Sequence, residues 1–438
     1  MGNLLIRCKY VLTMDSPEGF YTPGEIAVRG NQIYHVGLAG SAPEDFKPER
    51  VIDYPHMVAL PGFVNCHNHA AMTLLRGYAD DMPLMQWLNE KIWPMEDQLT
   101  GEDIYKGSLL ACAEMIKGGT TTFADMYFNM DWVARAVEET GMRAVLSRGI
   151  IGADASAEVS LNENIAFVEK WHNGANGRIT AMFGPHAPYT CPPEMLKKVI
   201  AEAKKLNVGI HIHLAETEDE MANIREQYGK TPVALMEDTG LFAIPVLAAH
   251  CVHLSPEDIE VLVKHQVGIA HNPQSNMKLS SGVAPVAQLL ASGAVVGVGT
   301  DGASSNNNLD MLEELRAASF MQKLQTKDAG ALPAYQALYL ATAGGAKVLG
   351  LTEQTGRLMK GLKADIILMD LDKPHMYPLY DVYAQIAYAA ASADVHTVII
   401  DGQIVMENRH LLTMDEPKVL TDAQSCAEAL ARRKKAAE

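Results

Sequence analysis

The chain has 438 residues, of which 48% are hydrophobic and 20% charged, and its formal net charge is −17 at pH 7. This composition fits a folded globular protein, and the acidic balance argues against a nucleic-acid partner, which needs a basic surface. The six cysteines form no C-x-x-C pair, the first residues are too polar for a signal peptide, and no apolar run reaches the ~18 residues of a membrane span. We therefore expect a cytoplasmic protein with reduced thiols that does not bind membranes.

Both ends of the chain consist of short apolar strands separated by turn residues. Residues 1–58 and 358–438 share this pattern, and each contains a hairpin signal, Gly30-Asn31 in the first and Asp401-Gly402 in the second. We expect the two ends to pair into one composite β-sandwich domain. The strands expected there are Leu4–Met14, Glu25–Val28, Gln32–Val36, Val51–Asp53, Ala364–Met369, Val395–Ile400 and Gln403–Met406.

The middle of the chain, residues 59–357, alternates apolar strands with longer amphipathic stretches, which is typical of a parallel α/β arrangement. Eight strands can be counted, and eight strands close a barrel, so the pattern predicts a catalytic (β/α)8 TIM barrel. The strands are Phe63–His67, Thr120–Met126, Arg143–Ile150, Ile179–Gly184, Val208–Leu214, Val246–His250, Val267–His271 and Val295–Thr300. The helices between them include Thr100–Gly118, Asp131–Thr140, Leu161–Asn173, Pro193–Leu206, Pro232–Thr239, Pro256–His265 and Ala284–Ser292.

Polar residues recur where these predicted strands end. His67 and His69 are two residues apart, so their side chains project from one face of the first strand. The later strand ends carry His186, His213, Glu216, His250, His271 with Asn272, and Asp301. Because the carboxyl ends of the strands surround the active site of such a barrel, this set predicts a polar ring at one rim.

Three imidazoles and one carboxylate of this ring can bind one divalent metal ion per subunit, for which we expect Zn²⁺. The expected ligands are His67, His69, His213 and Asp301. We expect His211 and His253, which lie close to ring members in the sequence, to pack in the core instead. Barrel hydrolases with two metals usually carry a bridging lysine on the fourth strand, and Ile179–Gly184 contains none. This absence favours a mononuclear site.

Hydrolysis also needs groups that move protons. A bound metal of this kind lowers the pKa of water from 15.7 to about 7. Glu216, three residues after His213, is the candidate acid, and Asp301 and His250 are candidates for taking up or orienting the water proton. Positioned groups of this kind typically contribute roughly 10²–10⁴-fold to a rate. The alternative for Glu216 is a carboxylate at the start of a helix, in the acidic stretch that ends at Glu220.

Several motifs resemble those of the amidohydrolase superfamily. They are Pro61–His69, His213–Glu216, Ala249–His253 and Gly299–Gly302. Within the superfamily the chain is similar to the 5-methylthioadenosine/S-adenosylhomocysteine deaminases over essentially its whole length. The matching stretches are Thr73–Leu88, Lys91–Pro94, Gly118–Tyr127 and Gly184–Tyr189.

The resemblance implies hydrolytic deamination of an adenine nucleoside at C6, giving the inosine analogue and ammonia. The substrates it implies are 5-methylthioadenosine, S-adenosylhomocysteine and adenosine. It implies that Glu96 accepts hydrogen bonds from ribose hydroxyls and that His186 binds substrate. It also implies that Glu216 protonates the purine ring, that His250 polarises the attacking water and that Asp301 relays its proton. Arg148, near the end of the third strand, is a candidate for binding the carboxylate of an amino-acid tail, with a structural salt bridge as the alternative.

Two other kinds of function stay open at this point. Another member of the superfamily, such as a guanine or aminopyrimidine deaminase or a triazine hydrolase, would share the metal ring, but only a ribose-bearing substrate needs Glu96. A non-catalytic scaffold would have no reason to keep all four ligands together with Glu216 and His250. Barrels of this type often associate, so we expect a homo-oligomer. We also expect its substrate to be a small-molecule nucleoside.

Overall fold

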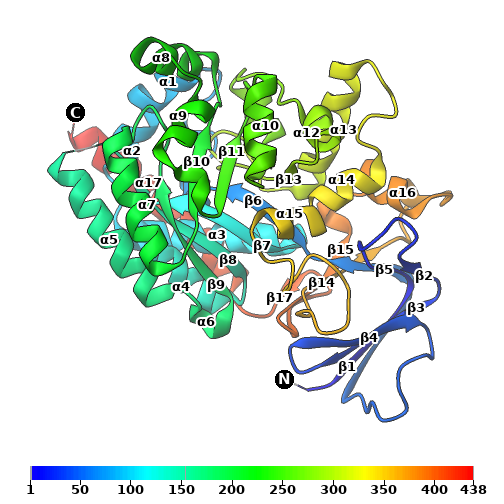
Figure 1. Ribbon diagram of the computed structural model, residues 1–438. Coiled ribbons are helices and arrows are strands. Elements are labelled where there is room, and N and C mark those ends of the chain that lie inside the picture. Colours follow the sequence, from blue (N-terminus) through cyan, green and yellow to red (C-terminus); the bar gives the residue numbers. More distant parts are fainter. Residues whose placement is uncertain (1, 153, 438) are drawn as a thin grey trace.

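The computed structural model describes residues 2–152 and 154–437, and it contains two β-sheets (Figure 1). The middle of the chain forms an eight-stranded parallel sheet surrounded by helices, and the two chain ends together form a nine-stranded mixed sheet. The predicted fold class, a (β/α)8 barrel with a small β domain built from both ends, is confirmed.

The barrel strands follow one another in chain order, and all their pairings are parallel. Their bounds are β6 (Phe63–Asn68), β7 (Thr120–Tyr127), β8 (Arg143–Ile150), β9 (Ile179–Pro185), β10 (Ile210–Leu214), β11 (Val246–His250), β12 (Gly268–His271) and β13 (Val295–Val298). They are almost entirely buried, as expected of strands covered by helices on one face and by the barrel core on the other.

The last strand meets the first through polar contacts of residues that follow β13. The Thr300 amide donates to Asn65 Oδ1 at 3.0 Å, and the Asn65 side-chain amide donates to Thr300 Oγ1 at 2.7 Å. The Asp301 amide then donates to the carbonyl oxygen of His67 at 3.0 Å. Closure of the barrel therefore brings Asp301 against His67, although the two are far apart in the sequence.

Helices cover the outside of this sheet (Figure 1). They include α3 (Gly101–Lys117), α4 (Met130–Thr140), α5 (Ala155–Trp171), α7 (Pro193–Leu206), α8 (Glu218–Tyr228), α9 (Pro232–Thr239), α10 (Pro256–Lys264), α12 (Val286–Ala291), α13 (Met311–Thr326), α14 (Ala334–Leu340) and α15 (Ala343–Val348). Capping boxes at Thr100 and Ser255 begin α3 and α10 where the sequence predicts. The helix α5 begins six residues earlier than predicted, because Asp154 accepts hydrogen bonds from the Ser156 and Ala157 amides and caps it.

The mixed sheet joins the two chain ends in the order β17-β16-β15-β14-β5-β1-β3-β4, with β2 paired to β1. Its strands are β1 (Leu4–Leu12), β2 (Phe20–Tyr21), β3 (Gly24–Arg29), β4 (Gln32–Leu38), β5 (Arg50–Pro61), β14 (Ile366–Asp370), β15 (Val395–Ile400), β16 (Gln403–Glu407) and β17 (His410–Leu411). Both predicted hairpins are present, and Asp401 and Gly402 adopt the positive φ values, 50° and 78°, that a two-residue hairpin turn requires. The antiparallel pair of β5 and β14 links the N-terminal and C-terminal parts.

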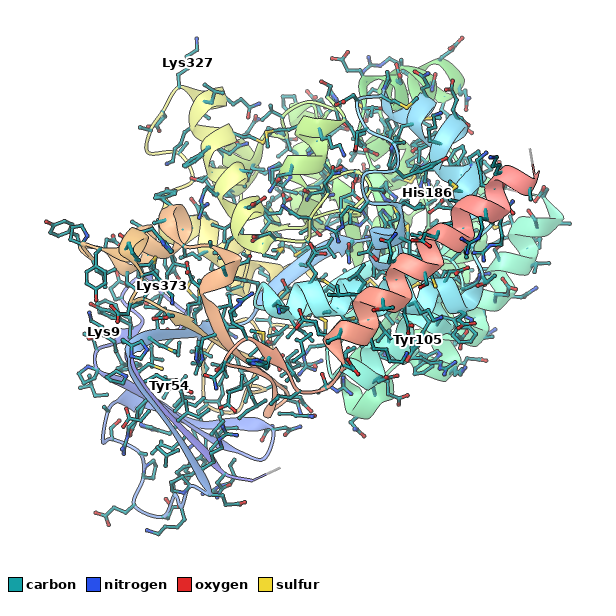
Figure 2. The ribbon with its side chains drawn as sticks, turned by 180° about the vertical axis from the view of Figure 1, so that it is seen from behind. Lys9, Tyr54, Tyr105, His186, Lys327 and Lys373 are labelled. Atoms are coloured by element: carbon teal, nitrogen blue, oxygen red, sulfur yellow. The ribbon has the colours of Figure 1, made fainter. Side chains whose placement is uncertain are left out.

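The strand β5 continues almost directly into β6 and so connects the two sheets. Gly62 separates them, and a Cβ there would lie only 2.1 Å from Thr121 Cγ2, so only glycine fits this close approach. The C-terminal helix α17 (Glu416–Ala437) crosses the outside of the barrel beside α3 (Figure 2). Lys117 pairs with Glu416 at 2.6 Å near one end of α17, and Arg433 pairs with Asp103 near the other. The domain boundaries near residues 58 and 358 stay a prediction, and the position of α17 shows that chain beyond residue 358 also packs on barrel helices.

Among the residues that the structure describes, no helix is both long and apolar enough to cross a lipid bilayer.

Candidate active site

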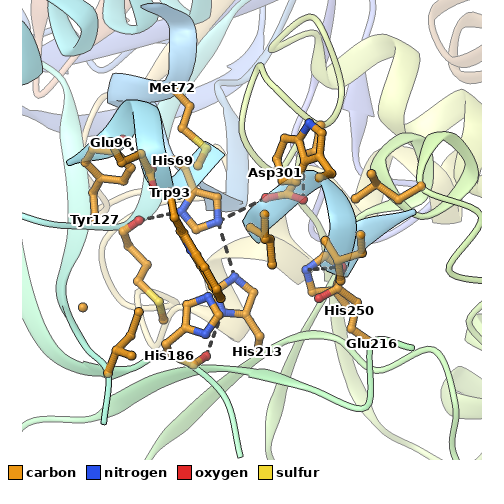
Figure 3. A pocket seen from close by; sticks show the side chains of 18 of the residues that line it. His69, Met72, Trp93, Glu96, Tyr127, His186, His213, Glu216, His250 and Asp301 are labelled. Carbon is orange, nitrogen blue, oxygen red and sulfur yellow. Dashed lines mark hydrogen bonds and ion pairs between the residues drawn. The ribbon is translucent and has the colours of Figure 1, made fainter. Parts of the chain in front are cut away.

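A cavity opens at the carboxyl ends of the barrel strands (Figure 3). Its volume, counting the part open to solvent, is about 690 Å³. The predicted site residues that line it are His69, Glu96, His186, His213, Glu216, His250 and Asp301. The other two predicted residues, His67 and Arg148, do not line the cavity. His67 is fully buried and contacts Asp301.

The four predicted metal ligands converge on one point. The carboxylate atom Asp301 Oδ1 lies 3.4 Å from His67 Nε2 and 3.2 Å from His69 Nε2. The His213 Nε2 atom lies 3.3 Å from His69 Nε2. The ligand atoms of His67, His69 and His213 lie within 4.8 Å of one another, and so do those of His67, His250 and Asp301, so the cluster offers donors of the kind that a divalent metal binds.

The opposite ring nitrogen of each histidine is held by the protein. His69 Nδ1 donates to the Met126 carbonyl oxygen at 2.5 Å, and His213 Nδ1 donates to the His186 carbonyl oxygen at 2.8 Å. Because a carbonyl oxygen can only accept, these contacts put a hydrogen on Nδ1 and make Nε2 the ring nitrogen that faces the cluster. His67 Nδ1 lies 2.8 Å from Nε2 of His211. We expected His211 to be a core residue, and it is fully buried, but it also contacts a candidate ligand.

Asp301 is oriented by groups on its other side. Its Oδ2 atom accepts hydrogen bonds from the Ser275 hydroxyl at 2.6 Å and from the Ser305 hydroxyl at 2.9 Å, while Oδ1 accepts from the Gly302 amide at 2.8 Å. The residue has a φ of 59°. Three donors therefore fix the carboxylate so that Oδ1 faces the imidazoles.

The electrostatics of the cluster suit a cation. Burial lowers the pKa of His67 to about 4 and that of His213 well below its usual value, so both rings are neutral and able to bind a metal. Burial opposes ionisation of Asp301, but the adjacent imidazoles of His67 and His69, whose Nε2 atoms lie 3.4 Å and 3.2 Å from Oδ1, hold the pKa of that carboxyl well below its usual value. The buried His67 Nε2 atom has no hydrogen-bond partner, and such an atom is expected to be satisfied by a ligand. The residues present therefore fit a zinc ion.

Glu216 and His250 lie together on one side of the cluster (Figure 3). The His250 Nε2 atom is 3.8 Å from Glu216 Oε1, and His250 Nδ1 bonds to Asn276 Oδ1 at 2.9 Å. Burial raises the pKa of the Glu216 carboxyl above its usual value, with the nearby Asp301 charge acting in the same direction. A raised pKa favours the protonated form, which a general acid needs.

Glu96 and Tyr127 lie on the opposite side of the cluster (Figure 3). Glu96 ends the short helix α2 (Trp93–Glu96), and Tyr127 ends strand β7. The Tyr127 hydroxyl donates to Glu96 Oε1 at 2.6 Å, and burial raises the pKa of Glu96 to about 7 despite this bond. Tyr127 is absent from the predicted site, although its position at a strand end is the signal that identified the histidines.

His186 follows β9 and shares the cavity wall with Trp93, Phe128 and Tyr189. Its Nδ1 lies 3.0 Å from the Thr190 hydroxyl oxygen, and burial lowers its pKa to about 3, so the ring is neutral. A second compartment of about 820 Å³, also counting open space, adjoins the cavity near Glu96. The two compartments share Trp93, Glu96, Tyr127, Phe128 and Ile151 as lining residues.

Arg148 does not line either compartment. On the neighbouring positions of β8, Ser147 contacts the buried His211 at 3.3 Å and Gly149 lines the cavity. Since side chains alternate along a strand, Arg148 points the other way, where its guanidinium pairs with Glu163 of α5. The sequence alone does not tell which residues of β8 face the barrel interior. Of the two alternatives stated for Arg148, a substrate contact and a structural salt bridge, this arrangement matches the salt bridge.

Known proteins resemble this chain over nearly its whole length. Residues 58–405 match the model of the amidohydrolase family. The chain is 60% identical to a 5-methylthioadenosine/S-adenosylhomocysteine deaminase of Pelotomaculum thermopropionicum, over 99% of this chain and 100% of that protein. A crystal structure of an adenosine deaminase from Xanthomonas campestris with bound zinc superposes with a TM-score of 0.94 and 34% identity, covering 98% of each chain. The zinc complex of an atrazine chlorohydrolase from Arthrobacter aurescens, at 24% identity and a TM-score of 0.90 over 97% of this chain and 100% of that one, shares the fold. The chain belongs to the amidohydrolase family.

Proposed function

We propose that this protein deaminates adenine nucleosides, with 5-methylthioadenosine, S-adenosylhomocysteine and adenosine as the substrates. The observation that carries the proposal is the placement of Glu96 and Glu216 on opposite sides of the histidine and aspartate cluster (Figure 3). A nucleoside offers ribose hydroxyls at one end and a purine ring at the other, so it can engage both carboxylates while C6 faces the cluster. The name of the Pelotomaculum thermopropionicum relative supports the same substrates.

The residues proposed to hold the metal are His67, His69, His213 and Asp301, with one Zn²⁺ in each subunit. When bound there, zinc would supply Lewis-acid chemistry and lower the pKa of a water molecule to about 7. The zinc in the solved Xanthomonas campestris neighbour supports this choice of metal. Strand β9 (Ile179–Pro185) carries no lysine, which supports a single ion over a bridged pair.

Proton transfers by the chain's own residues complete the reaction. As water adds to C6, Glu216 donates a proton to N1 of the purine, and its raised pKa keeps that proton available. Asp301, assisted by His250, accepts the proton that the water loses and passes it to the amino group. The C6–N bond then breaks and ammonia leaves as the C6 hydroxyl becomes the carbonyl of the inosine analogue; the hydroxyl proton returns to Glu216, and N1 keeps its hydrogen.

Substrate binding is assigned to Glu96 and His186. Tyr127 occupies one oxygen of Glu96, which leaves the other carboxylate oxygen to accept from the ribose hydroxyls. The second compartment begins at Glu96 and is lined by Leu99, Ile104 and Phe128 among other residues, so it can receive the 5′ substituent of the nucleoside. No contact of Arg148 with substrate is proposed, since Glu163 already occupies its guanidinium.

A guanine or triazine substrate has no ribose and would leave Glu96 without a partner, so the same observation counts against these alternatives. A non-catalytic scaffold would not need a buried, unpaired His67 Nε2. Homo-oligomerisation and a cytoplasmic location stay predictions from the sequence.

The test is ammonia release from 5-methylthioadenosine by zinc-loaded protein, with Glu96→Gln compared with Glu90→Gln. Glu90 is an exposed carboxylate in the helical turn Leu88–Ile92, which directly precedes α2, and it lies outside both compartments. We expect steady turnover by the wild-type protein, KM raised about tenfold or more in Glu96→Gln, because a charged hydrogen bond contributes about 1.5–3 kcal/mol, and no change in Glu90→Gln. Absence of turnover, or equal KM values for the two variants, would contradict the proposal.

A further inference from the structure

The segment that joins β10 to α8 carries Glu216 into the cavity in a constrained backbone conformation. Ala215 has a φ of 52°, in the left-handed region that residues with a Cβ rarely adopt, and it is fully buried. Its carbonyl oxygen accepts hydrogen bonds from the Val252 amide at 2.9 Å and the His253 amide at 3.0 Å, which tie this side of the turn to the loop after β11. Such a conformation persists only where the surroundings hold it.

The amide side of the same turn is held by Glu220. Glu220 Oε1 accepts from the Ala215 amide at 3.0 Å, and Oε2 accepts from the Glu216 amide at 2.8 Å. The Glu220 backbone is fixed in turn, since its amide donates to the Thr217 hydroxyl that caps α8. One carboxylate therefore binds two consecutive amides with its two oxygens and reaches back from the first turn of the helix to the residue proposed as the acid.

Burial makes this arrangement unusual for a merely structural contact. Glu220 is 2% exposed, and the partners of its two oxygens are backbone amides instead of a lysine, arginine or histidine side chain. Burial raises its pKa to about 8, with the two amide bonds opposing that shift. A buried carboxyl group is unfavourable unless its oxygens are hydrogen-bonded, and here the Ala215 and Glu216 amides supply those bonds.

We propose that Glu220 is a positioning residue for proton transfer, which clamps the Ala215 and Glu216 amides so that the Glu216 carboxyl faces the ring nitrogen of the substrate. The inference rests on the proposed function, because it assigns Glu220 an effect on the proton donor of that reaction. Glu220 itself touches neither the substrate cavity nor the metal cluster, since it does not line the cavity and its contacts are with the backbone. It should therefore act on kcat and leave nucleoside binding at Glu96 unchanged.

The substitution Glu220→Gln removes one acceptor at nearly constant volume. The amide group of glutamine would place N–H donors against a backbone N–H, so at least one of the two clamp bonds is lost. A displacement of about 1 Å at a reacting group can lower a rate by about 10²-fold. We expect kcat for 5-methylthioadenosine to fall by about 10–100-fold, with KM changed less than about twofold and zinc content unchanged.

The matched control is Glu218→Gln, which makes the same side-chain change in the same helical turn at an exposed position. It should behave as wild type. The decisive measurement repeats Glu220→Gln in a Glu216→Gln background, where a residue that acts only through the Glu216 carboxyl should have less than about a twofold further effect on kcat. If Glu220→Gln does not fold, Glu220→Asp, whose shorter side chain keeps the charge but retracts the two oxygens, is run through the same cycle and should give the same pattern.

Two results would overturn the inference while the proposed function stands: kcat of the Glu220 variant equal to that of Glu218→Gln, or an equal loss in the wild-type and Glu216→Gln backgrounds, which would indicate a general structural role. Failure of the wild-type protein to deaminate any adenine nucleoside would instead reject the proposed function, and the clamp with it.

Discussion

Replacing Arg143 with methionine should destabilise the whole chain by about 3–5 kcal/mol, the usual effect of breaking a buried ion pair. Arg143 begins β8 and is 1% exposed. Its Nε atom lies 2.8 Å from Asp365 Oδ2, and its Nη2 atom lies 3.2 Å from Asp365 Oδ1 and 3.4 Å from Asp401 Oδ1. One guanidinium from the barrel thus neutralises two carboxylates of the C-terminal part of the mixed sheet. Methionine would leave both of them buried without this cation.

The expected shift in melting temperature follows from the length of the chain. With about 2.1 cal/mol/K per residue, 438 residues have an unfolding entropy of about 0.9 kcal/mol/K, so 3–5 kcal/mol corresponds to about 3–5 °C if the two sheets unfold together. Calorimetry of Arg143→Met against Arg50→Met measures it. Arg50 pairs with Glu407 at the surface, with its side chain 51% exposed, and its loss should change stability by less than about 1 kcal/mol.

The double variant Arg143→Met/Asp365→Asn should recover part of the lost stability, because it removes one of the two buried carboxylates that Arg143→Met leaves without the guanidinium. Equal melting temperatures for Arg143→Met and Arg50→Met would refute the reasoning, because the buried pair would then contribute no more than the exposed one.

Three further predictions concern the site. KM for nucleosides should rise about tenfold as the pH falls from 8 to 6. The reason is that Glu96, with its pKa raised to about 7, loses its charge and an acceptor over this range. Initial rates measure KM at each pH, and a KM that does not change with pH would contradict the role of Glu96. His211→Phe should weaken zinc binding by about 10–100-fold in competition with a chromophoric chelator, because His211 contacts His67, one of the proposed ligands. The native His253 ring contacts the Ser281 carbonyl oxygen instead, so His253→Phe should leave zinc affinity unchanged. Equal zinc affinities of the two variants would show that His211 does not support metal binding. Glu216→Gln should lower kcat by about 10²–10⁴-fold with zinc content unchanged, and a normal rate would exclude Glu216 as the acid.

Periodicity and strand ends were sufficient to predict the barrel. Six of the eight barrel strands begin at their predicted residues, as β11 does at Val246, whereas β12 begins one residue later, at Gly268, and β10 two residues later, at Ile210. The strand β5 was predicted only as Val51–Asp53, because Pro55 and His56 interrupt its apolar pattern. In the structure it continues to Pro61, since β1 and β14 supply partners on both sides. Such strand pairing depends on segments that are far away in the sequence, so the residues of β5 themselves carry no pattern that predicts it.

The candidate ligands were predictable because each lies at the end of a strand, and a barrel brings such ends together. The contacts that form when the barrel closes could not be predicted from the sequence. The bonds from Ser275 and Ser305 to Asp301, and the contact of His211 with His67, join segments whose distance the sequence does not give. Arg148 illustrates the same limit within one strand, because its predicted role required knowing which face of β8 is the interior.

The measurement that tests the central claim most directly is loss of the adenine absorbance band with ammonia release. Zinc-loaded protein is offered adenosine, 5-methylthioadenosine, S-adenosylhomocysteine, guanine and an aminotriazine in parallel. The account predicts turnover of the three nucleosides alone, because only they present ribose hydroxyls to Glu96 and a purine ring nitrogen to Glu216. Turnover confined to guanine or the triazine would leave the metal cluster in place and contradict the assignment of the nucleoside substrate.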